Sequence, residues 1–275
     1  MKLRKRSFEQ IEVDTHKMTE KEALKLIPRK LYKYYPINEF TFKVLTEQAI
    51  YFSKPSGFSD PFDCKLNINF GKSTIQINEN LNHYFPQLVP LLDKTDIFNG
   101  SFKTTKEINQ FLNTLVLSIL DMQMGVTCFS EVRDSPLMWA HYAHSHSGIC
   151  LEFDMKTPSF FRDNLIPVMY FDKYPVYSME EYKSNGLGNL LTRMMASKSE
   201  DWDYEFEWRC TTEKGGAKTY SFDKALVTGI IFGINCPEDQ KTKILEILQD
   251  LNYCNCIPYQ ADMNSSKFKI DIVRY

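Results

Sequence analysis

A chain of 275 residues that is 43% hydrophobic and 14% aromatic is long enough to bury a sizeable core, which indicates a globular protein. Its 33 basic and 35 acidic residues leave a net charge of -2, which excludes a global field that would attract nucleic acid or an anionic membrane. Seven cysteines at irregular spacings favour a reducing compartment over a disulfide framework.

The start of the chain and its apolar runs indicate where the protein acts. The basic start "MKLRKRSF" lacks the apolar run and the cleavage site of a signal peptide. The longest apolar run, residues 111–120, is about half as long as a membrane span. We therefore expect a cytoplasmic protein with no membrane partner.

The first third of the chain predicts short alternating elements. Residues 1–18 are typical of a polar N-terminal arm, and Thr19 with Glu22 fits a capping box that opens a short helix. A strand, a helix and a second strand are then expected at 30–35, 39–48 and 49–54. The next segment, "PSGFSDPFDC", predicts a turn-dense loop, in which Asp60 and Asp63 either bond nearby amides or form one lip of a pocket.

The rest of the chain predicts a helical insertion followed by interspersed strands and helices. Apolar residues spaced by three and four indicate mainly helix from about 75 to 125. Further strands are expected at 126–131, 149–153, 167–171, 201–210, 225–234 and 267–275. Further helices are expected at 135–143, near 187–199 and at 238–251. Several strands follow one another too closely for helical crossovers, so we expect one α+β domain over 19–275, with a mixed, largely antiparallel sheet and flanking helices.

The segment "DWDYEFEWRC" at 201–210 is the first candidate site. As a strand, it would place aromatic residues on one face, namely Tyr204, Phe206 and Trp208. It would place charged residues on the other face, namely Glu205, Glu207 and Arg209. Two carboxylates on one face raise the proton affinity of one of them where water is scarce, and Arg209 opposes that rise. The pattern fits either a catalytic pair or a salt-bridge ladder.

The segment "WAHYAHSHSGIC" at 139–150 is the second candidate site. His141, His144 and His146 have spacings that could recruit zinc if the helix ends between them, but such clusters are more often polar helix ends, and we expect no metal. Trp139, Tyr142 and the imidazole of His141 fit better as groups that stack on and orient a planar ring.

Taken in series, five strings resemble a widespread, largely uncharacterised bacterial domain family, some members of which occur near phage-defence and abortive-infection genes. They are "LYKYY", "IYFSKPSGFSDPFDC", "TCFSE", "LMWAHYAHSHSGICLEFD" and "DYEFEWRC". The resemblance runs from about residue 31 to 235. It implies no particular reaction.

A more distant resemblance is to the ADP-ribosyltransferase superfamily, whose split, mixed sheet holds NAD in a cleft. The "EFE" string resembles its late-strand glutamates, which makes Glu207 the counterpart of the catalytic glutamate and Glu205 its companion and general base. "LYKYY" resembles the first strand, with Lys33 and Tyr34 where relatives place His or Arg. Ser130 or Tyr142 fills the middle-strand role.

The resemblance also implies how NAD, the expected co-substrate, is held. Tyr34 or Trp139 would stack on nicotinamide, Lys33 or Arg209 would bind the pyrophosphate, and His141 is a third catalytic candidate.

The implied function is transfer of ADP-ribose from NAD to a protein or nucleic-acid acceptor, as a toxin-like or phage-defence effector with a cognate antitoxin or defence partner. One alternative is a nucleotide-binding or phage-sensing module without turnover. Another is a hydrolase that uses the glutamate pair or zinc.

Overall fold

The computed structural model of the chain describes residues 26–92 and 104–275. The predicted polar arm at 1–18 and the capping box of Thr19 and Glu22 lie outside these residues. Within them, no helix combines the length and the apolar character needed to cross a membrane.

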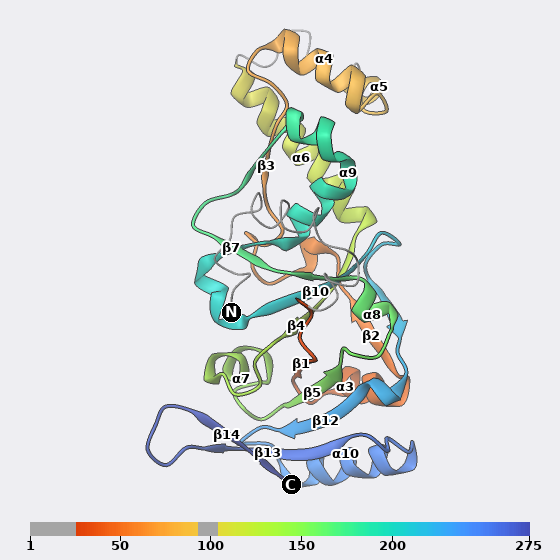
Figure 1. Cartoon of the computed structure of the whole chain (residues 1–275), viewed down its shortest axis with the longest axis vertical. Helices are drawn as coiled ribbons and strands as arrows, with labels where there is room; N and C mark the ends of the chain where they lie inside the picture. Colours follow the sequence, from red (N-terminus) through yellow and green to blue (C-terminus); the bar gives the residue numbers. More distant parts are fainter. Residues whose placement is uncertain (1–25, 93–103) are drawn as a thin grey trace.

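An eight-stranded open sheet forms the centre of the molecule (Figure 1). Its strand order is β14-β13-β12-β5-β1-β4-β10-β6. The strands are β1 (Lys30–Tyr35), β4 (Gly125–Ser130), β5 (Ile149–Asp154), β6 (Leu165–Pro167), β10 (Glu207–Thr212), β12 (Val227–Phe232), β13 (Ile257–Met263) and β14 (Ile270–Arg274). Among these described strands, only β12 and β13 pair in parallel, and the helix α10 (Glu238–Asp250) connects them. The predicted mixed, largely antiparallel α+β sheet is confirmed.

Three two-stranded sheets accompany the main one. β2 (Ala49–Phe52) pairs with β11 (Lys218–Ser221), β3 (Asn67–Asn69) with β8 (Val176–Ser178), and β7 (Met169–Phe171) with β9 (Ser197–Ser199). The β7–β9 pair lies against residues 200–205, the segment that precedes β10. Residues 197–199 of β9 therefore lie close to the start of β10, where the candidate site forms.

The helices divide into three groups, each with its own apolar cluster. On one face of the sheet, α3 (Glu39–Thr46), α8 (Phe160–Asp163) and α10 pack with β2. On the other face, α7 (Pro136–Tyr142) packs through the fully buried Trp139. At the top of Figure 1, α4 (Thr74–Tyr84), α5 (Val89–Leu92), α6 (Thr105–Gln123) and α9 (Met179–Ala196) gather above the sheet around β3. The buried faces of α4, α6 and α9 share a cluster with Ile68 of β3.

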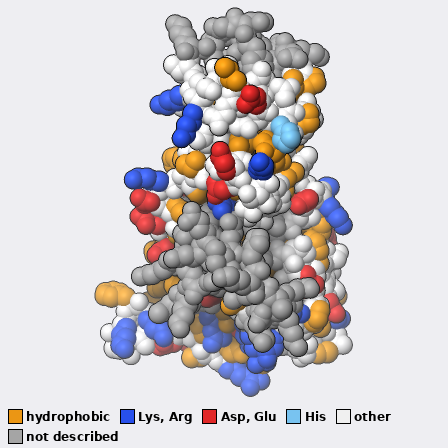
Figure 2. All heavy atoms as spheres, turned by 45° about the horizontal axis from the view of Figure 1, so that its top comes forward, with side chains coloured by type: hydrophobic (Ala, Val, Ile, Leu, Met, Phe, Trp, Pro, Cys, Tyr) orange, Lys and Arg blue, Asp and Glu red, His pale blue; other side chains and the backbone are white. Residues whose placement is uncertain are grey.

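Where Figure 2 shows described residues, both basic and acidic side chains reach the surface, with basic ones gathered at the lower end. The presence of both signs agrees with a net charge of -2.

Of the described strand pairs in the main sheet, β1 and β4 have the fewest paired residues. These strands share one paired position, Tyr32 with Ser130, whereas β1 and β5 share six and β4 and β10 share six. The Nζ of Lys33 spans the junction and donates to the carbonyl oxygen of Cys128 at 2.9 Å. The likeness of this opening to the split sheet of ADP-ribosyltransferases stays a prediction.

The predicted strand at 201–210 is wrong in its first half. Residues Glu200–Glu205 form the 3-10 helix η3, and β10 begins only at Glu207. Ser199 caps η3 by accepting a hydrogen bond from the amide of Asp201, and such local bonds from Ser and Asp compete with strand pairing. Phe206 then adopts the left-handed conformation, with φ 49°, and turns the chain into β10.

Candidate functional site

A cavity of about 140 Å³ lies at the junction of β1 and β4. Its walls are Tyr32 to Tyr34 of β1, Cys128 to Ser130 of β4, the loop that carries Asp60 and Asp63, and residues of α7, β9, η3 and β10. Aromatic rings form part of the wall, and buried charged groups form the rest. The polar side is a continuous network of ion pairs.

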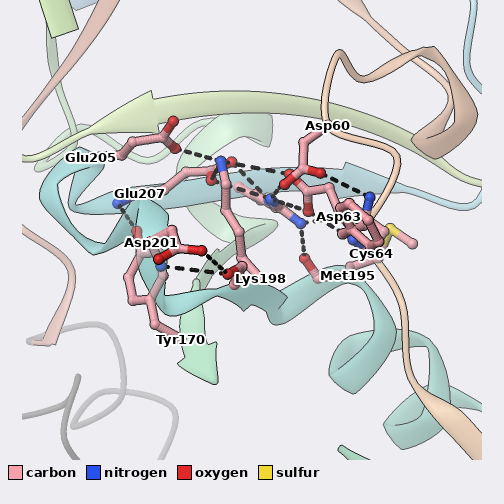
Figure 3. Close-up of polar contacts among 12 residues, drawn as sticks. Asp60, Asp63, Cys64, Tyr170, Met195, Lys198, Asp201, Glu205 and Glu207 are labelled. Atoms are coloured by element: carbon pink, nitrogen blue, oxygen red, sulfur yellow. Dashed lines mark hydrogen bonds and ion pairs between the residues drawn. The ribbon is translucent and has the colours of Figure 1, made fainter. Parts of the chain in front are cut away.

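Lys198 of β9 is the centre of this network (Figure 3). Its Nζ lies 2.5 Å from Glu205 Oε2, 2.9 Å from Glu207 Oε2 and 3.5 Å from Asp63 Oδ2. Burial alone would lower the pKa of Lys198, but the carboxylates around it, Glu207 first, raise the pKa above its ordinary value. Lys198 therefore stays charged.

Arg209 of β10 anchors the far side of the network. Its Nη2 donates to both carboxylate oxygens of Asp63, at 2.7 and 2.9 Å, and its Nε donates to Glu207 Oε1 at 2.8 Å. Its Nη1 donates to the carbonyl oxygen of Met195 at 2.7 Å and lies 3.0 Å from Cys64 Sγ. The guanidinium is fully buried, so the protein itself uses its hydrogen-bonding fork.

The two glutamates respond to this network in opposite ways. Burial and the neighbouring Glu207 raise the pKa of Glu205 to about 7, against the pull of Lys198. Burial also opposes the charge on Glu207, but Arg209 and Lys198 outweigh it and hold the pKa of that carboxyl well below its ordinary value. Glu207 is a fixed anion, whereas Glu205 can exchange a proton near neutral pH, as a general acid or base must.

Glu205 has two further partners that orient it. The hydroxyl of Tyr142 donates to Glu205 Oε1, and the hydroxyl of Ser130 donates to the backbone carbonyl of Glu205 at 2.5 Å. Burial first, and then the carboxylate of Glu205, raise the pKa of Tyr142, so this phenol stays a donor. Both candidates for the middle-strand role thus contact Glu205.

The backbone between the two glutamates makes their convergence possible. In a regular strand, residues 205 and 207 would stand in a row on one face. Phe206 instead has φ 49° and ψ 51°, a conformation that costs a non-glycine residue about 1 kcal/mol. The turn lets Glu205 approach Lys198 from η3 while Glu207 approaches it from β10.

The structure brings six of the nine predicted site residues to one cavity. They are Lys33, Tyr34, Ser130, Tyr142, Glu205 and Glu207. Lys33 and Tyr34 lie on β1, which β4 separates from β10, the strand of Glu207. The hydroxyl of Tyr34 donates to the carbonyl oxygen of Val132 at 2.8 Å, and burial raises its pKa well above the ordinary value.

Three predicted roles need correction. Arg209 is committed to Asp63 and Glu207, so it is not free to bind pyrophosphate. Trp139 is 0% exposed, packs edge-on against Tyr34 and donates its indole N–H to the carbonyl of Arg133, so it cannot stack on a ligand. His141 is exposed outside the cavity wall, with its ring 6.2 Å from that of Trp202.

The histidine cluster does not form a metal centre. Among the residues that the structure describes, no three His, Cys, Asp or Glu side chains are grouped so that they could hold a metal ion. His144 and His146 follow the end of α7 with positive φ angles, as residues of a turn.

Lys198 is the residue that sequence reasoning missed, because "ASKSED" has no feature that distinguishes this lysine from a surface lysine. For Asp63 the sequence left a choice between a local role and a pocket lip, and the residue belongs to the cavity wall. Trp202, which also lines the cavity, lies with its ring 5.2 Å from Lys198 Nζ. Only tertiary contacts reveal the places of Lys198 and Trp202 in this wall.

Comparison with known proteins gives one match. Searches of the curated proteins and of the solved structures find no similar chain. Residues 138–210, which include Tyr142, Lys198, Glu205, Glu207 and Arg209, match the family model described as "Protein of unknown function (DUF2971)".

Proposed function

We propose that the cavity binds the nicotinamide end of NAD and that the protein transfers ADP-ribose from NAD to a macromolecular acceptor. The observation that carries this proposal is the pair of glutamates with opposite proton affinities in one cavity wall, Glu205 with a pKa of about 7 and Glu207 held ionised. Glycosyl transfer needs both a fixed negative charge and a proton carrier.

Each glutamate has one role in the reaction. The bond between the ribose and nicotinamide breaks, nicotinamide leaves with the bonding electrons as a neutral molecule, and positive charge develops on the ribose. The carboxylate of Glu207 stabilises that charge. As nicotinamide departs, the acceptor attacks the ribose carbon and loses its proton to Glu205, which Tyr142 holds in place. This assignment keeps the expected roles of both residues.

The size of the space supports a substrate of this kind. A cavity of about 140 Å³ is comparable to one that holds benzene, so it suits a nicotinamide ring. A second cavity of about 440 Å³ shares Asp60, Lys198 and Trp202 with the first, and it offers room for the remainder of NAD. Lys33 and Tyr34 would face the nicotinamide end.

The biological setting of the proposal rests on the family resemblance alone. In this setting, the protein acts in the cytoplasm on a protein or nucleic acid, as a toxin-like or phage-defence effector. A cognate partner restrains its activity.

The experiment is to measure nicotinamide release from NAD by the full chain, with and without cell lysate. We expect Glu205→Gln to slow release by about 100-fold or more, since general acid-base groups contribute at least that much. Glu246→Gln removes an exposed carboxylate on α10 and should release nicotinamide at the wild-type rate. Folded wild-type protein that releases none under either condition would rule the proposal out.

One observation favours a second candidate, a nucleotide-binding module without turnover. Asp63, Glu205, Glu207, Lys198 and Arg209 are all paired with one another, as in a static framework. Calorimetry separates the two functions, because saturable NAD binding without nicotinamide release would support the binding module.

A further inference from the structure

Two lysines line the cavity, and their surroundings differ. Lys198 lies among three carboxylates. Lys33 has a different partner, the carbonyl oxygen of Cys128, at 2.9 Å. In the part of the chain that the structure describes, no carboxylate lies within ion-pair distance of Lys33 Nζ.

The neighbours of Lys33 are apolar on two further sides. Its Nζ lies 5.6 Å from the ring centroid of Tyr35 and 5.6 Å from that of Phe129. Burial lowers the pKa of Lys33, and the opposing effects of Cys128 and then Glu207 do not restore it. A larger fraction of Lys33 is therefore the neutral amine at pH 7 than of an exposed lysine.

We propose that Lys33 is a nucleophilic amine that forms a reversible imine with a small carbonyl compound bound in this cavity. The inference is independent of NAD and of ADP-ribosyl transfer. It rests on a half-buried amine, bonded to a backbone carbonyl, in a cavity that the proton carrier Glu205 also lines.

The chemistry balances with the groups that line the cavity. The lone pair of Lys33 Nζ attacks the carbonyl carbon, and the electrons of the C=O double bond move to oxygen, which takes a proton from protonated Glu205. The nitrogen then loses a proton to the Glu205 carboxylate. Transfer of that proton back to the hydroxyl expels water and leaves a protonated C=N bond, and the remaining N–H proton then returns to the Glu205 carboxylate. Nothing is oxidised or reduced, and the products are an imine and water.

The cavity also selects the class of carbonyl compound. Its volume, about 140 Å³, is comparable to that of a cavity that holds benzene, so it fits a small molecule of about one ring. Four carboxylates border it, from Asp60, Asp63, Glu205 and Glu207, against two lysines, so an anionic compound is disfavoured. Carboxylates accept hydrogen bonds from hydroxyl groups. A small neutral hydroxyaldehyde or hydroxyketone meets all three conditions.

The test uses glycolaldehyde as the probe. The full chain is incubated with glycolaldehyde and cyanoborohydride, which reduces an imine to a stable amine, and peptide mass spectrometry follows each lysine over time from pH 6 to 9. Two lysines of the same chain are the controls. Lys173 has a side chain that is 87% exposed, and Lys198 shares the cavity but is ion-paired.

We expect Lys33 to be modified about tenfold or more faster than Lys173 at pH 7, because the neutral amine is the reactive form. Lys198 should be modified most slowly of the three lysines. The ratio of the Lys33 rate to the Lys173 rate should fall as the pH rises, and urea denaturation should abolish the difference. Lys33→Arg should remove the fast adduct from the intact mass. Modification of Lys173 at least as fast as Lys33, or equal modification of Lys33 and Lys198, would overturn the proposal.

Discussion

Glu205 and Glu207 are separated by one residue, yet their surroundings drive their carboxyl pKa values in opposite directions. Both are buried, so both lose the solvation that favours the charged form. Glu207 has compensation on both oxygens, from Arg209 and Lys198. Glu205 has Lys198 on one oxygen and only the hydroxyl of Tyr142 on the other. Glu205 has one cationic partner fewer than Glu207, and this difference brings the pKa of its carboxyl close to neutral pH.

This difference predicts unequal costs for two similar substitutions. Glu207→Gln leaves the buried guanidinium of Arg209 without one of its two carboxylates, and breaking a buried ion pair costs about 3 to 5 kcal/mol. Glu205→Gln replaces a carboxyl of raised pKa with a neutral group that can still accept from Tyr142. Lys198 loses one carboxylate but keeps Glu207 and Asp63, so we expect a cost within about 1 kcal/mol. Urea unfolding at pH 7 measures both free energies of unfolding.

Glu246→Gln, on the exposed face of α10, is the control for loss of a carboxylate, and it should leave the urea midpoint unchanged. A Glu205→Gln variant as unstable as Glu207→Gln would mean that Glu205 is held mainly as an anion and does not exchange a proton near neutral pH.

At the scale of elements, α6 supports β3 through asparagine side chains. Asn113 accepts from the amide of Ile68 at 2.6 Å and donates to the carbonyl of the same residue at 2.7 Å. Asn109 accepts from the amide of Phe70 at 2.8 Å and donates to the carbonyl of Gly71 at 3.1 Å. These four bonds take the place of a neighbouring strand on that edge of β3.

We therefore predict that Asn113→Leu destabilises the helical part of the molecule. The amide and carbonyl of Ile68 would lose their partner, and each unsatisfied buried group costs about 1 to 3 kcal/mol. Hydrogen exchange followed by mass spectrometry should show faster exchange at β3 and α6. Gln110→Ala changes an exposed residue of the same helix and should leave exchange there as it is. Unchanged protection of β3 in Asn113→Leu would show that these bonds are dispensable.

Elements with strong local signals are those that could be predicted from the sequence. Ser135 and Pro136 mark the start of α7, and the Ser135 side chain does accept from the amide of Met138. β13 lacks such a signal, because Ile257–Met263 contains a proline and alternates poorly. α9 kinks at Gly186, where φ is 71°, so the helix predicted near 187 corresponds to its second half. Its first half, from Met179, was missed because it depends on a capping box of Ser178 and Glu181 that stands before any clear apolar periodicity.

The residues of the candidate site also differ in whether the sequence could predict them. Glu205, Glu207 and Tyr142 could be predicted because each stands in a short segment with unusual spacing, whereas Lys33 was expected from the resemblance of "LYKYY" to a first strand. Lys198 could not, because its importance arises only where β9 meets β10 and η3 in space.

At the scale of the whole molecule, the ion-pair network joins segments that are far apart in the sequence. Asp63 comes from a loop, Lys198 from β9, Glu205 from η3, and Glu207 and Arg209 from β10. With Glu205 ionised, three negative charges face two positive ones, and a proton on Glu205 makes the network neutral. The proton on Glu205 therefore affects the stability of the entire fold.

The direction of the pH dependence follows from the two glutamates. The pKa of Glu205 rises from 4.5 to about 7 on folding, so between these values the folded chain holds a proton that the unfolded chain has lost. Its stabilisation is complete below about pH 4.5 and disappears as the pH rises through about 7. The lowered pKa of Glu207 acts in the opposite sense, but at more acidic pH, since its stabilisation is lost only below pH 4.5.

We expect the free energy of unfolding of the wild type, relative to Glu205→Gln, to fall by at most about 3 kcal/mol between pH 4.5 and 8, because one pKa unit corresponds to about 1.4 kcal/mol. Urea unfolding of both proteins at a series of pH values measures this difference, and the comparison cancels carboxylates that the two chains share. A difference that stays flat across the range, or grows in favour of the wild type toward pH 8, would mean that Glu205 is ionised throughout and cannot carry protons in the reaction.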